Sequence, residues 1–469
     1  IAGRTLADRD QRLSIMAVGD DDQNIYQFRG ANVAFIRRFR EDYQARVSYL
    51  VDNYRSSGHI IAASNALIAG NRDRMKREHP IHLNPERQGL VPGGKWEKLD
   101  PLARGRVQVL QLADQNQQAL ALICELKRLT QLESGMQWSD CAVFVREWSV
   151  LEPIRALCEA EGIPVCMLAE KEKQPWPLRV RENRRLLEQL ISMGEELRQA
   201  DQLLELLDVL STASGENAWW AQLRHILQDW REETHNSELP VKRSIEFVCE
   251  SLIEQRRERQ LSDGVFLSTI HSAKGMEFSH VFVPEGGWGR ADNQQVKEAE
   301  RRLYYVAMTR ARETLCLFQL AQGKTGFAAN MDGDYLLRRE GVVDGDIPTE
   351  ALGRRYTVLG MQDINLGYAG RKGAHDPIHA VLSQLEVGDS LDAKLSGGKI
   401  LLMRGNLPVA SLSNSAGEVW RERLERLESI RVLAMVRRTA QDEEEVFRRS
   451  CWVAEWEVPL VEIISIEAG

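Results

Sequence analysis

Long apolar runs, paired cysteines and an excess of positive charge are all missing from this chain of 469 residues. No stretch of about 18 apolar residues occurs, so we expect no membrane-spanning helix. The seven cysteines are scattered without a CxxC pair, which argues against a zinc site or a disulfide framework and fits a cytoplasmic protein. The net charge of −8 gives no global attraction to nucleic acid, but it is compatible with a local basic groove.

Apolar runs of strand length alternate with helical patterns through much of the chain. The length predicts two to four domains, and the alternation predicts a parallel sheet. Residues 181–258 interrupt it with leucine stripes typical of packed helices. We expect a loop at 321–353, then short β runs at 354–469 with a helix near 414–428. The strands expected in the parallel sheet are 13–18, 47–51, 106–112, 141–145, 163–168, 264–270, 280–284 and 314–318.

The segment GDDDQNIYQFRGA, residues 19–31, combines three acids, an amide, two aromatic residues and an arginine. It follows an expected strand, and the carboxyl edge of a parallel sheet is where α/β proteins bind ligands. Gln23 can donate to a phosphate oxygen while it accepts from water. Tyr26 and Phe28 offer flat faces on which nucleobases can stack. Taken alone, the segment is equally compatible with an acidic turn and aromatic residues of the core.

Two further segments place polar side chains where an expected strand ends. In LVDNYRSSGHI, residues 50–60, Arg55 can direct its guanidinium at phosphate and Tyr54 can stack on a base. In FLSTIHSAKGMEF, residues 266–278, His271 and its polar neighbours suit the phosphates of a nucleic-acid backbone. Alone, each segment has an ordinary explanation, namely a common strand-end pair and a structural histidine.

The segment EAERRLYYVAMTRARETLCLF, residues 298–318, has the pattern of an amphipathic helix that runs into a strand. Its arginines are ordinarily explained as a solvated helix face. Arg310 lies at the end of the helix, beside the expected sheet edge. There it could stabilise charge on a transferring γ-phosphate, as an arginine finger does. The joint occurrence of the four segments decides between these explanations.

In order and content, the four segments resemble the UvrD/Rep/PcrA helicases of superfamily 1. GDDDQNIYQFRGA resembles motif III of that family, NYRSS motif IV, TIHSAKGMEF motif V and ERRLYYVAMTRAR motif VI. The resemblance covers residues from about 14 to 320, with the helical block where the family carries an insertion. Two departures are mild, since Phe28 stands where the family usually has Trp and Met276 where it has Leu.

The resemblance implies roles for individual residues around ATP, Mg²⁺ and single-stranded DNA. The implied catalytic residues at the γ-phosphate are Gln23, Arg55 and Arg310. The implied nucleotide-binding residues are Tyr54 at the adenine, Glu277 at the ribose, and Gly275. The residues that would hold DNA are Tyr26, Phe28, Arg29, Thr269 and His271.

The same resemblance implies an α/β fold. It is a RecA-like parallel-sheet P-loop NTPase helicase domain with a helical insertion, plus a small β-rich C-terminal domain. The expected ranges are 1–46 for the end of a first RecA-like domain, 47–169 and 261–322 for the two segments of a second, 170–260 for the helical insertion, 323–353 for a linker and 354–469 for the β-rich domain.

Two parts that this family needs for ATP hydrolysis are missing from the sequence. The phosphate-binding loop GxxxxGK followed by Ser or Thr does not occur, because Phe318 stands where the first glycine before Gly323-Lys324-Thr325 belongs. The Asp-Glu pair that binds Mg²⁺ is also missing, and we do not assign the acids at 20–22 as metal ligands. We therefore expect the C-terminal portion of a longer helicase, inactive by itself.

For the intact protein we expect ATP-dependent 3′→5′ movement along single-stranded DNA, with unwinding at duplex junctions in repair or recombination. The direction comes from the family alone. The alternative is a non-catalytic, helicase-derived module that binds DNA or regulates repair factors. Arg55 and Arg310 favour the helicase, since a pure binding protein has no use for side chains at a γ-phosphate. Protein partners cannot be read from the sequence.

Overall fold

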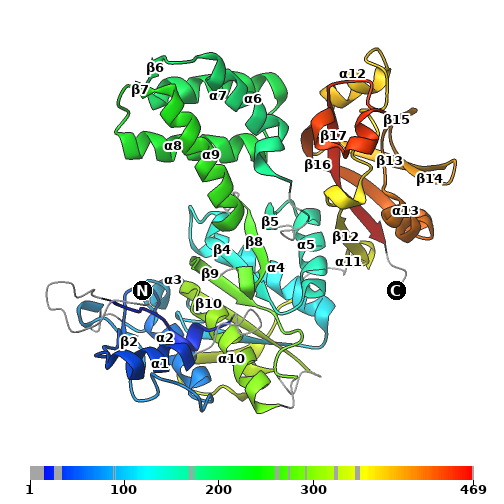
Figure 1. Ribbon diagram of the computed structural model, residues 1–469. Helices are drawn as coiled ribbons and strands as arrows, with labels where there is room; N and C mark the ends of the chain where they lie inside the picture. The colour runs from blue at the N-terminus through cyan, green and yellow to red at the C-terminus, as the bar shows by residue number, and fades with distance from the viewer. Residues whose placement is uncertain are drawn as a thin grey trace. The chain divides into compact units, whose positions relative to one another are not determined.

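The protein, described here by a computed structural model (Figure 1), divides into two compact units. The first unit is Ile1–Val165 with Asp263–Ile347, and the second is Cys166–Ser262 with Pro348–Gly469. None of the helices described has the length and apolarity to cross a membrane. The structure describes residues 15–25, 34–87, 89, 91–167, 173, 175–258, 264–272, 275–290, 293–321, 326–343 and 349–466, but not the side chains of 254–258, 272, 349 and 350.

A seven-stranded sheet forms the centre of the first unit, in the order β11-β3-β10-β9-β4-β8-β5. The strand pairs with a defined register are parallel, as the alternation of strands and helices predicted. The strands are β3 (Val107–Leu112), β4 (Cys141–Val145), β5 (Val165–Met167), β8 (Val265–Thr269), β9 (Phe278–Val283), β10 (Ala311–Leu320) and β11 (Leu336–Glu340).

Several helices of the first unit contact this sheet. Helix α4 (Gln115–Leu132) contacts β3 and β10, and α5 (Leu151–Ala160) contacts β8. Helix α10 (Gln294–Met308) contacts β9 and β10. Asn293 caps the tenth helix by accepting from the N–H groups of its first turn. The two short strands β1 (Asp52–Asn53) and β2 (His82–Leu83) pair with each other. The helices are α1 (Ala34–Tyr43), α2 (Gly58–Ile68), α3 (Trp96–Leu99), α4 (Gln115–Leu132), α5 (Leu151–Ala160) and α10 (Gln294–Met308).

Three sequence-based expectations differ from the structure. Residues 15–18 of the expected strand at 13–18 form no strand, because a strand needs a neighbour for its backbone and no described strand pairs with them. The strand expected at 47–51 is replaced by β1, immediately after it. The loop expected at 321–353 contains β11, which pairs with β3 at the edge of the sheet.

Four long helices make one core of the second unit (Figure 1), as the leucine stripes predicted. Trp220, Leu223 and Leu227 are fully buried in this core. The indole Nε1–H of Trp220 donates to Ser214 Oγ at 3.1 Å, so its polar atom is satisfied. The helices are α6 (Arg181–Ser192), α7 (Ala200–Ser214), α8 (Ala218–Thr234) and α9 (Val241–Glu258).

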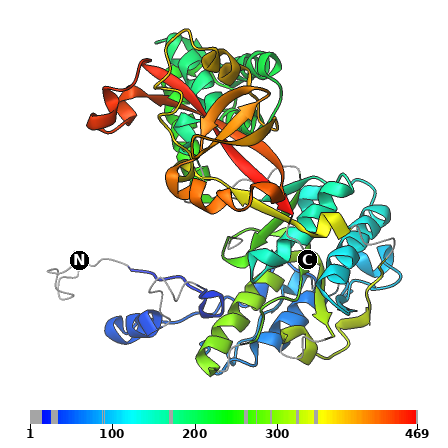
Figure 2. The same cartoon turned by 90° about the vertical axis from the view of Figure 1, so that its right-hand side faces the viewer.

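The second unit also contains a six-stranded antiparallel sheet, in the order β12-β17-β16-β13-β14-β15. The long strands β16 and β17 lie side by side, in orange and red (Figure 2). The helix expected near 414–428 is shorter and ends at Arg421. The elements are β12 (Arg354–Val358), β13 (Ser390–Ser396), β14 (Lys399–Arg404), β15 (Leu407–Ser411), β16 (Leu427–Thr439), β17 (Glu455–Ile466), α11 (Thr349–Leu352), α12 (Pro377–Gln384), α13 (Asn414–Arg421) and α14 (Glu445–Arg448).

Arginine side chains join the helices of the second unit to its sheet. Arg181, at the start of α6, is buried and donates from Nε to Glu457 Oε1 of β17 at 2.7 Å. Its Nη2 also donates to the carbonyl oxygen of Leu382 at 2.5 Å. Arg437 of β16 pairs with Glu188 of α6 at 2.9 Å. Helices and sheet of this unit are therefore held together by charge-assisted contacts.

Candidate nucleotide and DNA site

An acidic turn presents Gln23. Residues Asp21–Gln23 form one 3-10 turn, and Asp20 caps it by accepting from the N–H of Asp22 at 3.1 Å. Gln23 donates its side-chain amide to the second carboxylate oxygen of Asp20 at 2.9 Å. Gln23 Oε1 lies 3.5 Å from Nη2 of Arg310. The turn therefore orients Gln23 so that its amide nitrogen faces an acid and its oxygen faces an arginine.

Arg55 reaches the same place from another part of the chain. Asn53 Oδ1 accepts from the N–H groups of Arg55 at 2.9 Å and Ser56 at 2.8 Å, which makes a tight turn after β1. Ser56 Oγ then donates to the carbonyl oxygen of Ala311, at the start of β10, at 2.7 Å. As a result, Nη1 of Arg55 lies 3.4 Å from the carbonyl oxygen of Thr309, which follows α10.

Arg310 is the buried centre of this cluster, with 3% of the residue exposed. Its guanidinium donates to the carbonyl oxygens of Val306 and Met276, to Thr309 Oγ1 and to Gln23 Oε1, all of them neutral acceptors. Burial, with repulsion from Arg55, lowers the pKa of Arg310 to about 10. A buried cation with neutral partners would be stabilised by an anionic ligand.

The residues expected to bind the rest of the nucleotide lie around Arg55. Glu277 forms an ion pair with Arg55 and lies 3.8 Å from Arg312, so its carboxylate bridges two guanidinium groups. The side chains of Arg55 and Glu277 are 34% and 39% exposed. Tyr54 is 69% exposed, which leaves its ring open to a ligand. Gly275 has a φ of +93°, a conformation that favours glycine.

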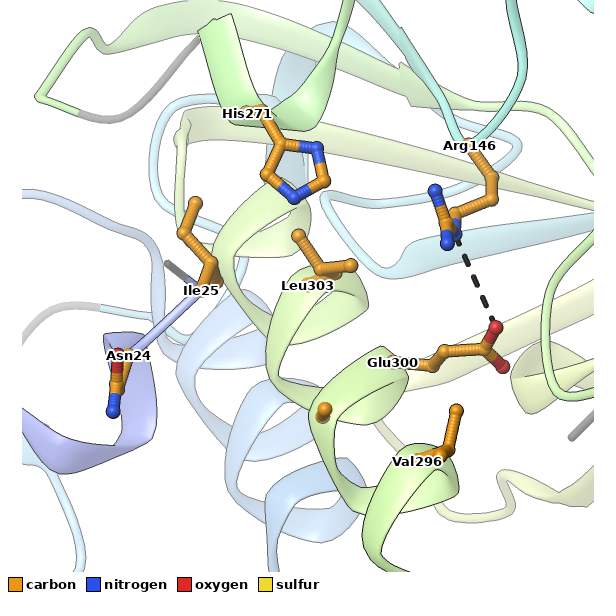
Figure 3. A pocket seen from close by; sticks show the side chains of 8 residues that line it. Asn24, Ile25, Arg146, His271, Val296, Glu300 and Leu303 are labelled. Carbon is orange, nitrogen blue, oxygen red and sulfur yellow. Dashed lines mark ion pairs between the residues drawn. The ribbon is translucent and has the colours of Figure 1, made fainter. Parts of the chain in front are cut away.

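A cavity of about 400 Å³ lies next to this cluster in the first unit (Figure 3). His271 comes from the turn after β8, two residues beyond Thr269, the last residue of that strand. Arg146 follows β4 and faces Glu300 of α10 at 3.9 Å. The cavity therefore combines charged and apolar walls. The lining residues are Asn24, Ile25, Arg146, His271, Val296, Ala299, Glu300 and Leu303.

The structure brings together Gln23, Arg55 and Arg310 from three separate segments. Tyr26, Phe28 and Arg29, expected to hold DNA, lie outside the described residues. Sequence reasoning missed Arg146, although it directly follows a strand whose range was expected correctly. The signal was its position, because polar residues at the carboxyl ends of parallel strands line ligand sites.

Two family models match the chain, the UvrD/REP helicase N-terminal domain over residues 4–44 and the UvrD-like helicase C-terminal domain over residues 179–322. The chain is UvrD/Rep/PcrA-like. These matches confirm the family resemblance and cover three of the four segments, since 4–44 contains GDDDQNIYQFRGA and 179–322 contains the third and fourth segments, whereas residues 50–60 lie in neither range.

Curated relatives carry helicase names. "DNA helicase II" of Escherichia coli (strain K12) is 26% identical over 380 residues, which cover 65% of this chain and 51% of that protein. "ATP-dependent DNA helicase PcrA" of Bacillus subtilis (strain 168) is 25% identical over 388 residues, with 67% and 52% covered. The UvrD-like chain thus spans about half the length of the curated relatives that it matches.

A solved structure described as the C-terminal domain of a possible DNA helicase, from a Lactobacillus, aligns with 61% of this chain and 100% of its own. The alignment has 12% sequence identity and a TM-score of 0.29, which is too low to support an argument about the fold. The fold class rests instead on the parallel sheet of the first unit and the antiparallel sheet of the second.

Proposed function

We propose that this UvrD-like chain forms part of an ATP-driven DNA helicase and that Gln23, Arg55 and Arg310 contact the γ-phosphate of ATP. The observation that supports this proposal is the meeting of the three side chains around a buried cation. Arg310 is desolvated, lies near a second guanidinium and donates only to neutral oxygens in the part of the chain described. A phosphoryl group would supply the compensating negative charge.

Binding of a nucleotide would require Arg55 and Glu277 to exchange their mutual ion pair for ligand contacts. Both side chains are partly exposed, and such ion pairs contribute only about 0–1 kcal/mol to stability. Breaking this pair therefore costs little free energy. Arg55 would then turn to phosphate and Glu277 to the ribose hydroxyls. Tyr54 has an exposed ring on which adenine can stack.

Mg²⁺ is the cofactor that accompanies ATP in this proposal, but the acids of the turn do not fit as its ligands. Asp22 already receives two hydrogen bonds from Arg74, at 2.8 and 2.7 Å, and Asp20 pairs with Lys76 at 2.6 Å. A cation there would meet two positive charges. The acids of this turn are therefore not assigned as Mg²⁺ ligands.

Single-stranded DNA is the proposed second ligand, at the cavity beside Gln23. Ile25 and Leu303 supply apolar wall on which a base can pack, and His271 and Arg146 supply donors for phosphate. Tyr26, Phe28 and Arg29 directly follow Ile25 in the sequence and belong to this proposal as predictions. Gln23 and Ile25 belong to one short segment. A movement of Gln23 on loss of the γ-phosphate would therefore also shift the wall of the cavity proposed for DNA. Movement in the 3′→5′ direction rests on the family resemblance.

We expect Arg310→Ala to reduce DNA-stimulated ATP turnover by about 10³–10⁵-fold, as loss of an arginine finger does. The measurement uses the protein that joins this chain to a phosphate-binding loop, with single-stranded DNA binding measured in parallel and expected to persist. Arg312→Ala is the matched control, because Arg312 is two residues away and more than half exposed. Near-normal turnover by Arg310→Ala would refute the role. DNA binding by the unaltered protein without any ATP turnover would favour the non-catalytic alternative.

A further inference from the structure

Three adjacent acids repel one another, yet two of them are buried in this chain. Asp22 is 1% exposed, and Arg74, whose side chain is 7% exposed, holds it through two hydrogen bonds. Asp21 accepts from the backbone N–H of Met75 at 2.6 Å. Asp20 pairs with Lys76 at 2.6 Å. Each acid of the turn therefore has its own partner in one short loop, residues 71–76.

The loop at 71–76 is itself attached to α10. Arg302 donates to the carbonyl oxygen of Asp73 at 2.7 Å, and Arg301 donates to Asn71 Oδ1 at 2.6 Å. The backbone N–H of Arg72 donates to Glu298 Oε1 at 3.0 Å. The loop thus rests on the helix whose C-terminal end leads directly into Arg310. A continuous series of hydrogen bonds and ion pairs runs from that helix, through the loop, to the acidic turn.

Asp20 connects this path to the amide of Gln23. Its Oδ1 lies against Lys76, and its Oδ2 accepts from Nε2 of Gln23. A carboxylate can only accept, so it selects the amide nitrogen of Gln23 and leaves the amide oxygen for Arg310. With no acceptor at position 20, this side-chain contact would not distinguish the amide nitrogen from the oxygen.

We propose that the acidic turn Asp20–Asp22 and the loop at 71–76 form a charge latch that positions Gln23 against Arg310. Asp20 and Lys76 are its positioning residues, and the Arg74–Asp22 pair anchors it. The latch connects residues of the expected first RecA-like domain, 1–46, to residues of the expected second one, which begins at 47. This inference rests on the proposed function, because it assigns the latch to the same γ-phosphate site.

The test compares four variants with the unaltered protein, again with the phosphate-binding loop present. We expect Asp20→Ala and Lys76→Met to lower kcat for DNA-stimulated ATP hydrolysis by about 10- to 100-fold, since small misplacements of a reacting group cost that much. The KM for ATP and the affinity for single-stranded DNA should stay near their normal values. Lys76→Arg keeps the cation and should retain most of the activity. Asp73→Asn is the control, because its exposed carboxylate in the same loop pairs with Arg37 instead.

The outcomes separate this inference from the proposed function. An unaltered protein that hydrolyses no ATP refutes both. If the unaltered protein hydrolyses ATP and Lys76→Met has the same kcat, the latch proposal is refuted but the proposed function is not. An equal fall in kcat in Lys76→Met, Lys76→Arg and Asp73→Asn would show that the loop affects only folding. This outcome would also refute the latch. A fall in kcat in Lys76→Met with recovery in Lys76→Arg supports it.

Discussion

Buried arginines in this chain fall into two kinds, distinguished by their partners. Arg74 and Arg181 each face a carboxylate, Asp22 and Glu457, and their charge is compensated within the fold. Arg310 is equally buried, but its hydrogen bonds go to neutral oxygens. A buried charge without an opposite charge beside it is costly, and an anionic ligand would reduce that cost for Arg310. Arg302 is also buried and donates to the carbonyl oxygen of Asp73, so it is the approach of Gln23 and Arg55 that distinguishes Arg310.

Glu285 gives a prediction about pH. It follows β9, and burial raises the pKa of its carboxyl from the usual 4.5 to about 7. Between these values the folded protein keeps a proton that the unfolded chain releases, so stability falls as the pH rises through this window. Each pKa unit corresponds to about 1.4 kcal/mol, which makes the full loss roughly 3 kcal/mol.

We therefore expect Glu285→Gln to match the unaltered chain near pH 4 and to exceed its free energy of unfolding by up to roughly 3 kcal/mol at pH 8. Urea unfolding of both proteins across this range measures the difference. A constant difference at all pH values would show that Glu285 keeps an ordinary pKa in the folded protein.

The helix α10 is the element on which the candidate site depends. It carries Glu298 and Arg302, which hold the loop at 71–76, and it contributes Glu300 and Leu303 to the cavity. Its C-terminal end leads into Arg310. One helix thus links the cavity to the cation proposed for the γ-phosphate.

In the second unit, the helix α6 gives a prediction about stability. Its first residue, Arg181, is buried against Glu457 of β17. Replacing one partner of a buried pair leaves the other charge uncompensated, so Arg181→Met should destabilise this unit by about 3–5 kcal/mol. The double variant Arg181→Met/Glu457→Leu should recover much of that loss. Chemical denaturation checks both, and a double variant no more stable than the single one would contradict the account.

Most strands of the first unit could be predicted from the sequence because buried parallel strands consist of uninterrupted apolar runs. CAVFV became β4 at the expected residues, and HVFVP lies within or just beyond β9. The strand β11, LLRRE, was missed because an edge strand with two arginines has no apolar pattern. LSIMAV has the pattern of a strand, but residues 15–18 have no described neighbour to pair with.

For the candidate site, the resemblance to the helicase motifs implied Gln23, Arg55 and Arg310; the structure places them near one another, and their contact with a γ-phosphate stays a prediction. Arg74 and Lys76 were missed, because they stand in an arginine-rich loop that no local pattern distinguishes. Their roles depend on which acids the fold brings to them. Contacts between residues some 50 positions apart follow from tertiary packing, which a single sequence does not display.

The two units together make a UvrD-like chain with two kinds of architecture. The first contains the parallel sheet and the candidate site, and the second contains the helical block with the antiparallel sheet. The chain spans about half the length of its curated relatives, and the proposed activity is to be tested in a protein that supplies a phosphate-binding loop as well. The chain's own contribution would be the residues at the γ-phosphate and part of the DNA site.

A structure of that protein with a non-hydrolysable ATP analogue and a single-stranded oligonucleotide tests the central proposal. We predict that the side chains of Gln23, Arg55 and Arg310 all lie within hydrogen-bond distance, about 3 Å, of oxygens of the γ-phosphate. Arg55 should have left Glu277 for the phosphate, while Gln23 keeps its bond to Asp20. A γ-phosphate bound elsewhere, with Arg310 still bonded only to neutral protein oxygens, would contradict the account.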